Sequence, residues 1–313
     1  MTVEEYEQNL IENIIELEKK LKKKRYRTKL VKRVLIPKGE GKYRPLGIIC
    51  LEDKLVQIAA TRILEAIYEV DFLDCSYGYR PGRGARIAVH TVWERLMNGK
   101  YNYVLDADIK GFFDNINHDW LIKMLKQRIK DESFIELIKK WLKAGILEEG
   151  KVIRPGKGTP QGGIISPILS NIYLHYVVDL WVAKKMEKKC RGRIYICRYA
   201  DDIIFAFQYV GDVMMFRRLL KQRLQKFNLE LSEEKTKIIK FSRFRKKEGN
   251  RFEFLGIEYR WQTGRKGDVI KQRTSRKKLK SCIRNFNFIG FKELCRSFNL
   301  LHPQIKGYQP TPA

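Results

Sequence analysis

The chain has 313 residues, 44% of them hydrophobic, which is enough for a sizeable core in one large or two modest domains and excludes an intrinsically disordered chain. Lys and Arg number 64 against 36 Asp and Glu, giving a formal net charge of +28. This excess predicts an anionic partner. Nucleic acid ranks ahead of a membrane surface, because binding to a polyphosphate releases counterions.

The cysteines, the N-terminus and the apolar stretches indicate the cellular compartment of the protein. The six cysteines contain no C-x-x-C pair, which excludes a disulfide scaffold and a zinc ribbon. The N-terminus carries Glu4 and Glu5 and is not typical of a secretory signal. The most apolar stretch, residues 162–183, is interrupted by Pro167 and Asp179, so it does not predict a membrane span. We therefore expect a cytoplasmic protein with no membrane partner.

The first hundred residues predict helices around a basic β-hairpin. Apolar side chains recur every three or four residues over 6–21 and again over 53–70, as in amphipathic helices. Between them, β-rich runs at 31–36 and 43–49 flank a glycine-containing turn, which predicts a hairpin able to bind phosphates. Residues 76–84 then combine glycine and proline with tyrosines and arginines. Such a loop suits stacking on bases, and a surface loop with buried tyrosines is the alternative.

The remaining chain mixes helices and strands without regular alternation. We expect strands at 101–109, 193–208 (a hairpin folded about residues 200–202), 236–241 and 252–260. We expect helices at 120–129, 133–143, 166–180 and 212–227, with a glycine-rich loop at 155–163 and a basic tail at the end. This order predicts the α+β class rather than a doubly wound parallel sheet.

Acidic residues at two strand ends suggest a catalytic centre. Asp106 and Asp108 share one face of an apolar strand, where a carboxylate is costly unless it is paired or metal-bound. Salt bridges to nearby arginines are the alternative. Asp201 and Asp202 stand together at a hairpin tip, and adjacent carboxylates need a compensating cation. Three acids from two strand ends fit a pair of Mg²⁺ ions for in-line phosphoryl transfer. The glycine-rich loop lacks the Walker pattern, which argues against a kinase-like phosphate-binding site.

Seven sequence blocks, in order across residues 30–260, resemble the reverse transcriptases encoded by bacterial group II introns, also called maturases. The blocks are Ile36-Pro37-Lys38 with Tyr43 to Gly47, Ser76 to Arg83, Ala107 to Asp114, Gly158 to Gly163 with Ser166-Pro167, Tyr199 to Asp202, Leu231 to Lys235, and Phe254 to Gly256. A single Tyr-x-Asp-Asp would be weak, whereas the ordered set is highly specific.

The resemblance implies a right-hand polymerase fold of fingers and palm with an incomplete thumb. The fingers would be residues 1–100 and 116–165, and the palm 101–115 and 166–260. Residues 261–313 would start the thumb or form a basic tail, with a basic helix opening at 271–280. Relatives carry a further N-terminal segment and a three-helix thumb, so we expect a truncated or minimal form.

The resemblance also implies the metal ligands. Asp108 and Asp201 would be the principal ligands of two Mg²⁺ ions, for which Mn²⁺ could substitute, with Asp202 supporting and the carbonyl of Ile109 completing one shell. Lys235 would donate a proton to pyrophosphate, although Lys237 is close by. Asp106 and Asp114 have no role in the family pattern and are expected to be structural.

Further residues are implied to contact the nucleotide or the nucleic acid. Phe113 would be the sugar gate that excludes a ribose 2′-hydroxyl, and a core phenylalanine is the alternative. The other nucleotide contacts would be Lys38 and Arg44 on the triphosphate, the backbone amides of Lys110, Gly111, Phe112 and Phe113, and Gln161. The template and primer contacts would be Tyr79, Arg80, Arg83, Gly162, and the primer grip Phe254, Leu255 and Gly256.

These implications predict an RNA-directed DNA polymerase that adds deoxynucleotides to a primer 3′-hydroxyl. The expected partners are an RNA template such as intron RNA, a DNA primer and dNTPs. One alternative is a non-catalytic RNA-binding maturase that retains a polymerase-like body. Another is an RNA-templated enzyme of phage defence, which the same palm would allow. The presence of all three acids favours the catalytic polymerase over the non-catalytic maturase, since an inactive site would not need three clustered carboxylates.

Overall fold

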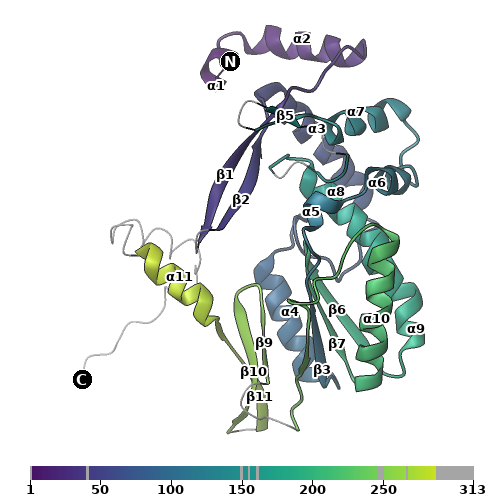
Figure 1. Ribbon diagram of the computed structural model, residues 1–313, viewed down its shortest axis with the longest axis vertical. Coiled ribbons are helices and arrows are strands. Elements are labelled where there is room, and N and C mark those ends of the chain that lie inside the picture. The colour runs from purple at the N-terminus through teal and green to yellow at the C-terminus, as the bar shows by residue number, and fades with distance from the viewer. Residues whose placement is uncertain are drawn as a thin grey trace.

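The structure is a computed structural model that describes residues 2–39, 42–148, 151–153, 156–159, 162–244, 250–265 and 267–286. Three β-sheets and the helices around them follow one another along the molecule (Figure 1). Among the described residues, none of the helices combines the length and hydrophobicity that a bilayer crossing requires.

The N-terminal part contains two helices and a four-stranded sheet. The helices are α1 (Val3–Glu7) and α2 (Leu10–Lys22), so the helix predicted over 6–21 is divided near residue 9. Strands β1 (Val31–Gly39) and β2 (Lys42–Ile48) form the predicted hairpin, with Arg33 opposite Gly47 and Ile36 opposite Arg44. Two short strands that the sequence did not predict complete the order β2-β1-β4-β5: β4 (Ile146–Glu148) and β5 (Lys151–Ile153).

A bundle of helices connects this sheet to the rest of the molecule. Its members are α3 (Leu51–Tyr68), α5 (Phe112–Asn115), α6 (His118–Leu125), α7 (Glu132–Leu142) and α8 (Ser166–Leu174). Helix α8 continues through the π-helical turns η1 (His175–Asp179) and η2 (Val182–Met186) into α9 (Glu187–Lys189). Buried side chains such as Leu64, Leu121, Ile138 and Leu169 join these helices into one core.

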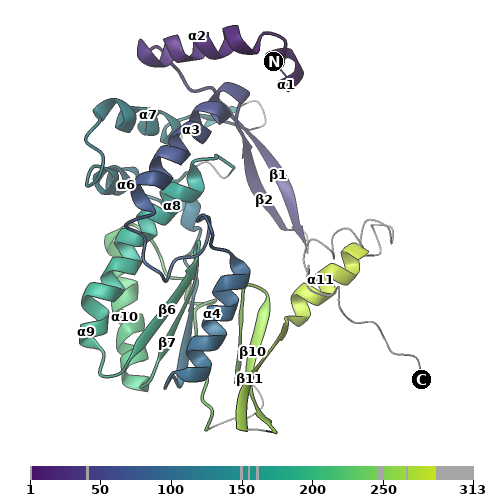
Figure 2. The same cartoon turned by 180° about the vertical axis from the view of Figure 1, so that it is seen from behind.

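The second sheet has the order β6-β7-β3-β8 and is covered on both faces. Its strands are β3 (Tyr103–Ala107), β6 (Ile194–Tyr199), β7 (Asp202–Phe207) and β8 (Lys237–Lys240). On one face Phe205 and Phe207 pack against Phe216 of α10 (Val210–Lys226). On the other face Val104 and Ile204 join the core beneath α4 (Ala85–Asn98), a helix that the sequence pattern did not predict (Figure 2).

The third sheet lies beside α4 and has the order β11-β10-β9. Its strands are β9 (Arg251–Phe254), β10 (Ile257–Gly264) and β11 (Gly267–Thr274), followed by α11 (Arg276–Phe286). The prediction of a basic helix at 271–280 is wrong for its first residues. Residues 271–274 extend β11, because they pair with residues 257–260 of β10, and the helix begins only at Arg276.

Candidate active site

The strand register brings the predicted acidic residues to one end of the second sheet. In the antiparallel pair of β3 and β7, Ala107 lies opposite Ile203, so Asp108 follows where β7 begins at Asp202. In the hairpin of β6 and β7, Tyr199 lies opposite Asp202, which leaves Ala200 and Asp201 as the turn. Asp108, Asp201 and Asp202 are thus neighbours at the end of adjacent strands, although Asp108 is 93 positions from Asp201 in the sequence.

Negative charge accumulates at this sheet end. Asp106 lies opposite Ile204, and side chains two positions apart on a strand share a face, so Asp106 is on the same face as Asp108 and Asp202. Burial, followed by the charges of Asp202 and Asp108, raises the pKa of Asp106 to about 6. Lys237 lies opposite Asp106 in the register of β3 and β8 and opposes this rise. The sheet end therefore attracts cations.

The segment before β8 holds Asp108 in place. The backbone N–H of Asp108 donates to Thr236 Oγ1 over 3.3 Å, and its carbonyl accepts from the N–H of Ser232 over 2.8 Å. The Nζ of Lys235 lies 3.3 Å and 3.4 Å from the two carboxylate oxygens of Asp108. Ile109 is buried and forms a β-bridge with Leu231. The positions of Asp108 and of the Ile109 backbone are thus fixed from one side.

Residues 75–78 support the turn that carries Asp201 from the other side. Arg198 donates its backbone N–H to Cys75 over 2.8 Å, and its carbonyl accepts from the N–H of Tyr77 over 2.8 Å. Ala200 has a φ of +56°, a conformation that costs a non-glycine residue energy. A Cβ on Gly78 would lie 2.4 Å from the Ala200 nitrogen, so only glycine allows this close approach.

The three predicted template residues of the 76–84 loop have different surroundings. Tyr79 is exposed, and its ring centroid lies 6.4 Å from that of Tyr199, next to the acidic turn. Burial and the charge of Asp201 raise the pKa of Tyr79. The guanidinium of Arg83 binds the Asp74 carboxylate over 2.6 Å and lies over the ring of Tyr77. Only Tyr79 of these three therefore presents a broad exposed surface beside the acids.

Arg80 is a correction to the sequence prediction. Its side chain is 2% exposed, and its Nε and Nη2 bind the Glu69 carboxylate over 2.7–3.1 Å. Its Nη1 donates to the carbonyls of Leu73 and Ser76 over 2.8 Å and 2.9 Å. Because the guanidinium is enclosed by the protein, Arg80 does not lie along a template but holds its own loop together.

The predicted nucleotide contacts lie on β1, β2 and the segment after β3. Arg44 is exposed on β2, and Lys110 and Gly111 are exposed directly after the acidic strand. Phe112 is buried, with its ring 5.3 Å from that of half-buried Phe113. Lys38 belongs to β1, but its side chain, like the whole of Gln161, lies outside the described residues.

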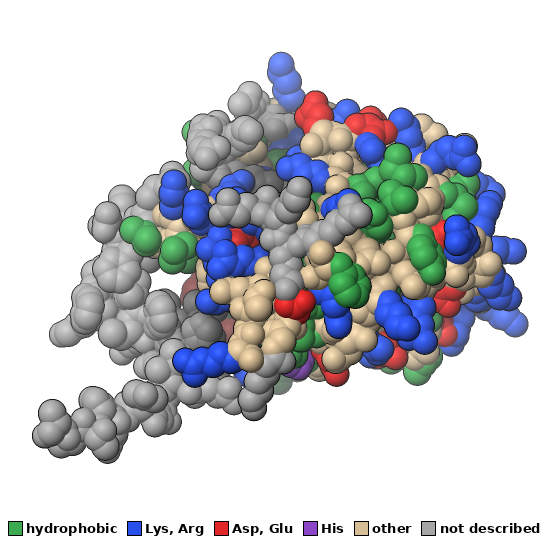
Figure 3. Space-filling view, turned by 90° about the horizontal axis from the view of Figure 1, so that it is seen from below, with side chains coloured by type: hydrophobic (Ala, Val, Ile, Leu, Met, Phe, Trp, Pro, Cys, Tyr) green, Lys and Arg blue, Asp and Glu red, His purple; other side chains and the backbone are tan. Residues whose placement is uncertain are grey.

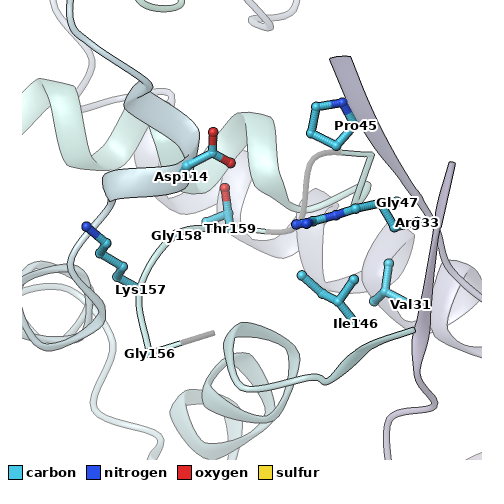
Figure 4. A pocket seen from close by; sticks show the side chains of 10 residues that line it. All are labelled: Val31, Arg33, Pro45, Gly47, Asp114, Ile146, Gly156, Lys157, Gly158 and Thr159. Atoms are coloured by element: carbon cyan, nitrogen blue, oxygen red, sulfur yellow. The ribbon is translucent and has the colours of Figure 1, made fainter. Parts of the chain in front are cut away.

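A pocket of about 400 Å³ opens between the β1–β2 hairpin and the loop at 156–159 (Figure 4). Its lining includes the charged residues Arg33 of the hairpin, Lys157 of the loop and Asp114 of α5. The Oγ1 of buried Thr159, also in the lining, has no hydrogen-bond partner among the described residues. Gly162 lies close against the hairpin: its φ is +104°, and a Cβ there would lie 2.3 Å from the Gly47 carbonyl oxygen.

The predicted primer grip is a turn between β9 and β10. Phe254 is buried in the core that α4 covers, whereas Leu255 and Gly256 have φ values of +50° and +79°. The carbonyl of Gly256 accepts from the N–H of Ser275 over 2.9 Å, which connects the turn to the start of α11. Leu255 and Gly256 are partly exposed, and the side chain of Lys278 lies close to Gly256.

A divalent cation fits the donor chemistry of the acidic sheet end. Within the described ranges, no three His, Cys, Asp or Glu side chains are gathered closely enough to form a ready metal site. The donors at the sheet end are carboxylate and carbonyl oxygens, the ligands that Mg²⁺ prefers, and Mg²⁺ often takes only one or two carboxylates together with substrate phosphates. The ammonium group of Lys235 beside Asp108 shows that this position accommodates positive charge.

A mixed α+β chain with aspartates gathered at one end of its second sheet and a basic hairpin beside the helices is the arrangement of a right-hand polymerase fold. The family model described as "Reverse transcriptase (RNA-dependent DNA polymerase)" matches residues 36–259, and the chain belongs to this family. The right-hand fold is confirmed by telomerase of Candida tropicalis truncated from its C-terminal domain. That structure has a TM-score of 0.60 and 16% identity, over 79% of this chain and 55% of that one.

Curated relatives confirm the resemblance to proteins of group II introns. Protein YkfC of Escherichia coli K12 is 35% identical over 237 residues, covering 66% of this chain and 62% of the relative. The group II intron-encoded protein LtrA of Lactococcus lactis is 42% identical over 187 residues, covering 59% and 30%. Nuclear intron maturase 3 of Arabidopsis thaliana is 28% identical over 174 residues, covering 49% and 24%. The chain thus spans less than two thirds of the length of these relatives.

Proposed function

We propose that this chain is an RNA-directed DNA polymerase of the group II intron type, which joins dNTPs to a primer 3′-hydroxyl. The observation that carries the proposal is the register that sets Asp108 beside the turn of Asp201 and Asp202. In this proposal residues 1–100 and 116–165 are fingers, 101–115 and 166–260 are palm, and 261–313 begin the thumb.

Asp108 and Asp201 would hold two Mg²⁺ ions, supported by Asp202 and the Ile109 carbonyl. When bound, such ions lower the pKa of the primer hydroxyl and neutralise the leaving pyrophosphate. The protein contributes the position of the ligands, because Ser232 and Thr236 fix the backbone of Asp108.

Other side chains would bind and orient the substrates. Arg44, exposed on β2, would bind the triphosphate together with Lys38, and Gln161 would contact the nucleotide. Phe113 would close the space beside the sugar, and the exposed ring of Tyr79 would stack on a base. Lys235 would hold the proton that neutralises pyrophosphate. Lys and Arg side chains are spread over the face shown in Figure 3, which suits an RNA template.

The Arabidopsis relative is named an intron maturase, and one test separates the proposed polymerase from a maturase that only binds RNA. The full chain is given a DNA primer on an RNA or a DNA template with Mg²⁺. Asp201→Asn should abolish extension while RNA affinity stays unchanged, because amide oxygen is a poorer ligand than carboxylate. The control Asp119→Asn, on the exposed side of α6, should behave as wild type.

Two results would contradict the proposal. Extension by Asp201→Asn at the wild-type rate would refute the metal ligands. Tight RNA binding by a wild-type chain that never extends a primer would favour the non-catalytic maturase.

A further inference from the structure

The side chain of Arg198 is completely buried directly behind the acidic turn. Its Nε and Nη2 bind the two carboxylate oxygens of Asp179 over 2.9 Å and 2.6 Å. Its Nη1 donates to Asn171 Oδ1 over 2.8 Å and to the Ala200 carbonyl over 3.2 Å, and its Nη2 donates to Ser76 Oγ over 2.7 Å. All five N–H groups of the guanidinium therefore have an acceptor.

The four side chains of this Arg198 network (Ser76, Asn171, Asp179 and Arg198) come from separate parts of the chain. Asn171 lies in α8 and Asp179 ends the turn η1, while Ser76 belongs to the segment 75–78 that supports the acidic turn. All four are at most 1% exposed. Asn171 also donates its Nδ2 to the Gly78 carbonyl over 2.7 Å. The network thus fastens the helix behind the sheet to the supporting loop and to the turn.

A network of this kind is a poor means of adding stability. The cost of removing two ions from water offsets most of their attraction. An apolar cluster of the same volume would stabilise the core equally well or better. A buried guanidinium instead fixes the orientation of its neighbours, because its planar N–H donors hold each acceptor in one position. Here one of the acceptors is the carbonyl of Ala200, the residue with positive φ immediately before Asp201.

We propose that the Arg198 network positions the carboxylates of Asp201 and Asp202 opposite Asp108, and that Arg198 and Asp179 are positioning residues for the metal ligands. The bond from Arg198 Nη1 holds the Ala200 carbonyl, and Gly78 closes the other side of the same residue. The peptide that leads into Asp201 then has one orientation. This inference rests on the proposed function, since it concerns the same acidic turn.

The chain offers a matched control in Asp212, a second buried acid of the palm. Its carboxylate accepts from the backbone N–H groups of Arg191 and Gly192 over 3.1 Å and 2.9 Å. These residues precede β6, so they lie at the end of that strand opposite to the acidic turn. Like Asp179→Asn, Asp212→Asn removes one buried negative charge from a helix that packs on the second sheet. Unlike Asp179→Asn, it leaves the hydrogen bonds of the acidic turn intact.

The experiment compares Asp179→Asn, Arg198→Lys and Asp212→Asn in the full chain. Hydrogen exchange of the amides of residues 200–203 should accelerate about 10-fold or more in the first two variants, because the turn opens locally. The Mg²⁺ concentration for half-maximal primer extension should rise about 10-fold, as for other residues that orient metal ligands. Asp212→Asn should accelerate exchange near 190–193 and leave both turn exchange and the Mg²⁺ requirement unchanged.

The outcomes separate this inference from the proposed function. Unchanged exchange at the turn in Asp179→Asn overturns the positioning role, whether or not the chain extends primers. An equal rise of the Mg²⁺ requirement in Asp212→Asn also overturns it, as an effect of general destabilisation. A wild-type chain without extension contradicts the polymerase, while exchange still decides the positioning. If Asp179→Asn does not fold, Ser76→Ala, which removes one acceptor, must show faster turn exchange for the inference to stand.

Discussion

Lys235 and Asp108 form a contact across 127 residues of sequence, with Nζ 3.3 Å from the nearer carboxylate oxygen. The lysine side chain is 70% exposed, and an ion pair so open to solvent contributes little to stability. Lys237, two residues later, lies instead opposite Asp106 in β8. The two lysines that the sequence left as alternatives therefore have different acidic neighbours, Asp108 for Lys235 and Asp106 for Lys237.

Lys235→Ala should lower the rate of primer extension about 100-fold, the typical contribution of a positioned proton donor. The free energy of unfolding should change little, because the lost ion pair is exposed. Single-turnover extension at saturating dNTP measures the rate, and Lys237→Ala is the control that should remain close to wild type. A larger loss in Lys237→Ala than in Lys235→Ala would move the proton donor to the second lysine.

Phe113→Ala should weaken discrimination against ribonucleotides. The ring of Phe113 is half-buried and packs edge-on against Phe112, so it has a fixed position shortly after the exposed residues Lys110 and Gly111. Removing it opens space for a 2′-hydroxyl, and such a steric contact typically changes selectivity about 10- to 200-fold. The measurement is the ratio of ribonucleotide to deoxynucleotide incorporation. An unchanged ratio in Phe113→Ala would argue against the gate.

Local sequence pattern predicted the elements that carry the acids, but not every partner of those elements. The apolar runs around Asp108 and around Asp201 identified both strands, because alternating burial is a short-range signal. The parallel pairing of β4 with β1 was missed, since β4 has only three residues and its partner lies over a hundred residues away. The π-helical turn that ends at Asp179 leaves no local signal that a sequence pattern could detect.

Arg80 shows how a side chain can be assigned to the wrong role. An arginine beside tyrosines is typical of nucleic-acid contacts, and arginines are seldom fully buried. Its acid, Glu69, is eleven residues away in the sequence, and the enclosing carbonyls are backbone atoms that no motif records. The burial of Arg80 could therefore be known only from the folded chain.

Arg80→Met should lower the free energy of unfolding by about 2 kcal/mol, less than for a fully buried pair because Glu69 is 34% exposed. RNA affinity of the folded variant should stay at the wild-type level. Arg83→Met is the comparison, because its partner Asp74 is 96% exposed and its loss should cost less than about 1 kcal/mol. Urea unfolding and filter binding give the two quantities. Wild-type stability with a loss of RNA affinity in Arg80→Met would restore its role as a template contact.

Gly162→Ala should push the loop segment at Gly162 away from the β1–β2 hairpin. The backbone there has a φ of +104°, and a Cβ would meet the Gly47 carbonyl oxygen at 2.3 Å, so neither strand nor loop can keep its place. We expect a loss of about 2 kcal/mol or more in the free energy of unfolding, from backbone strain and overlap together. Gly156→Ala is the control, because a Cβ there meets no atom within 4 Å, and it should unfold as wild type. Residues 156–159, shortly before Gly162, line the pocket beside Arg33, so Gly162→Ala should also raise the KM for dNTP. A variant with wild-type stability and wild-type KM would show that the loop does not depend on the contact between Gly162 and Gly47.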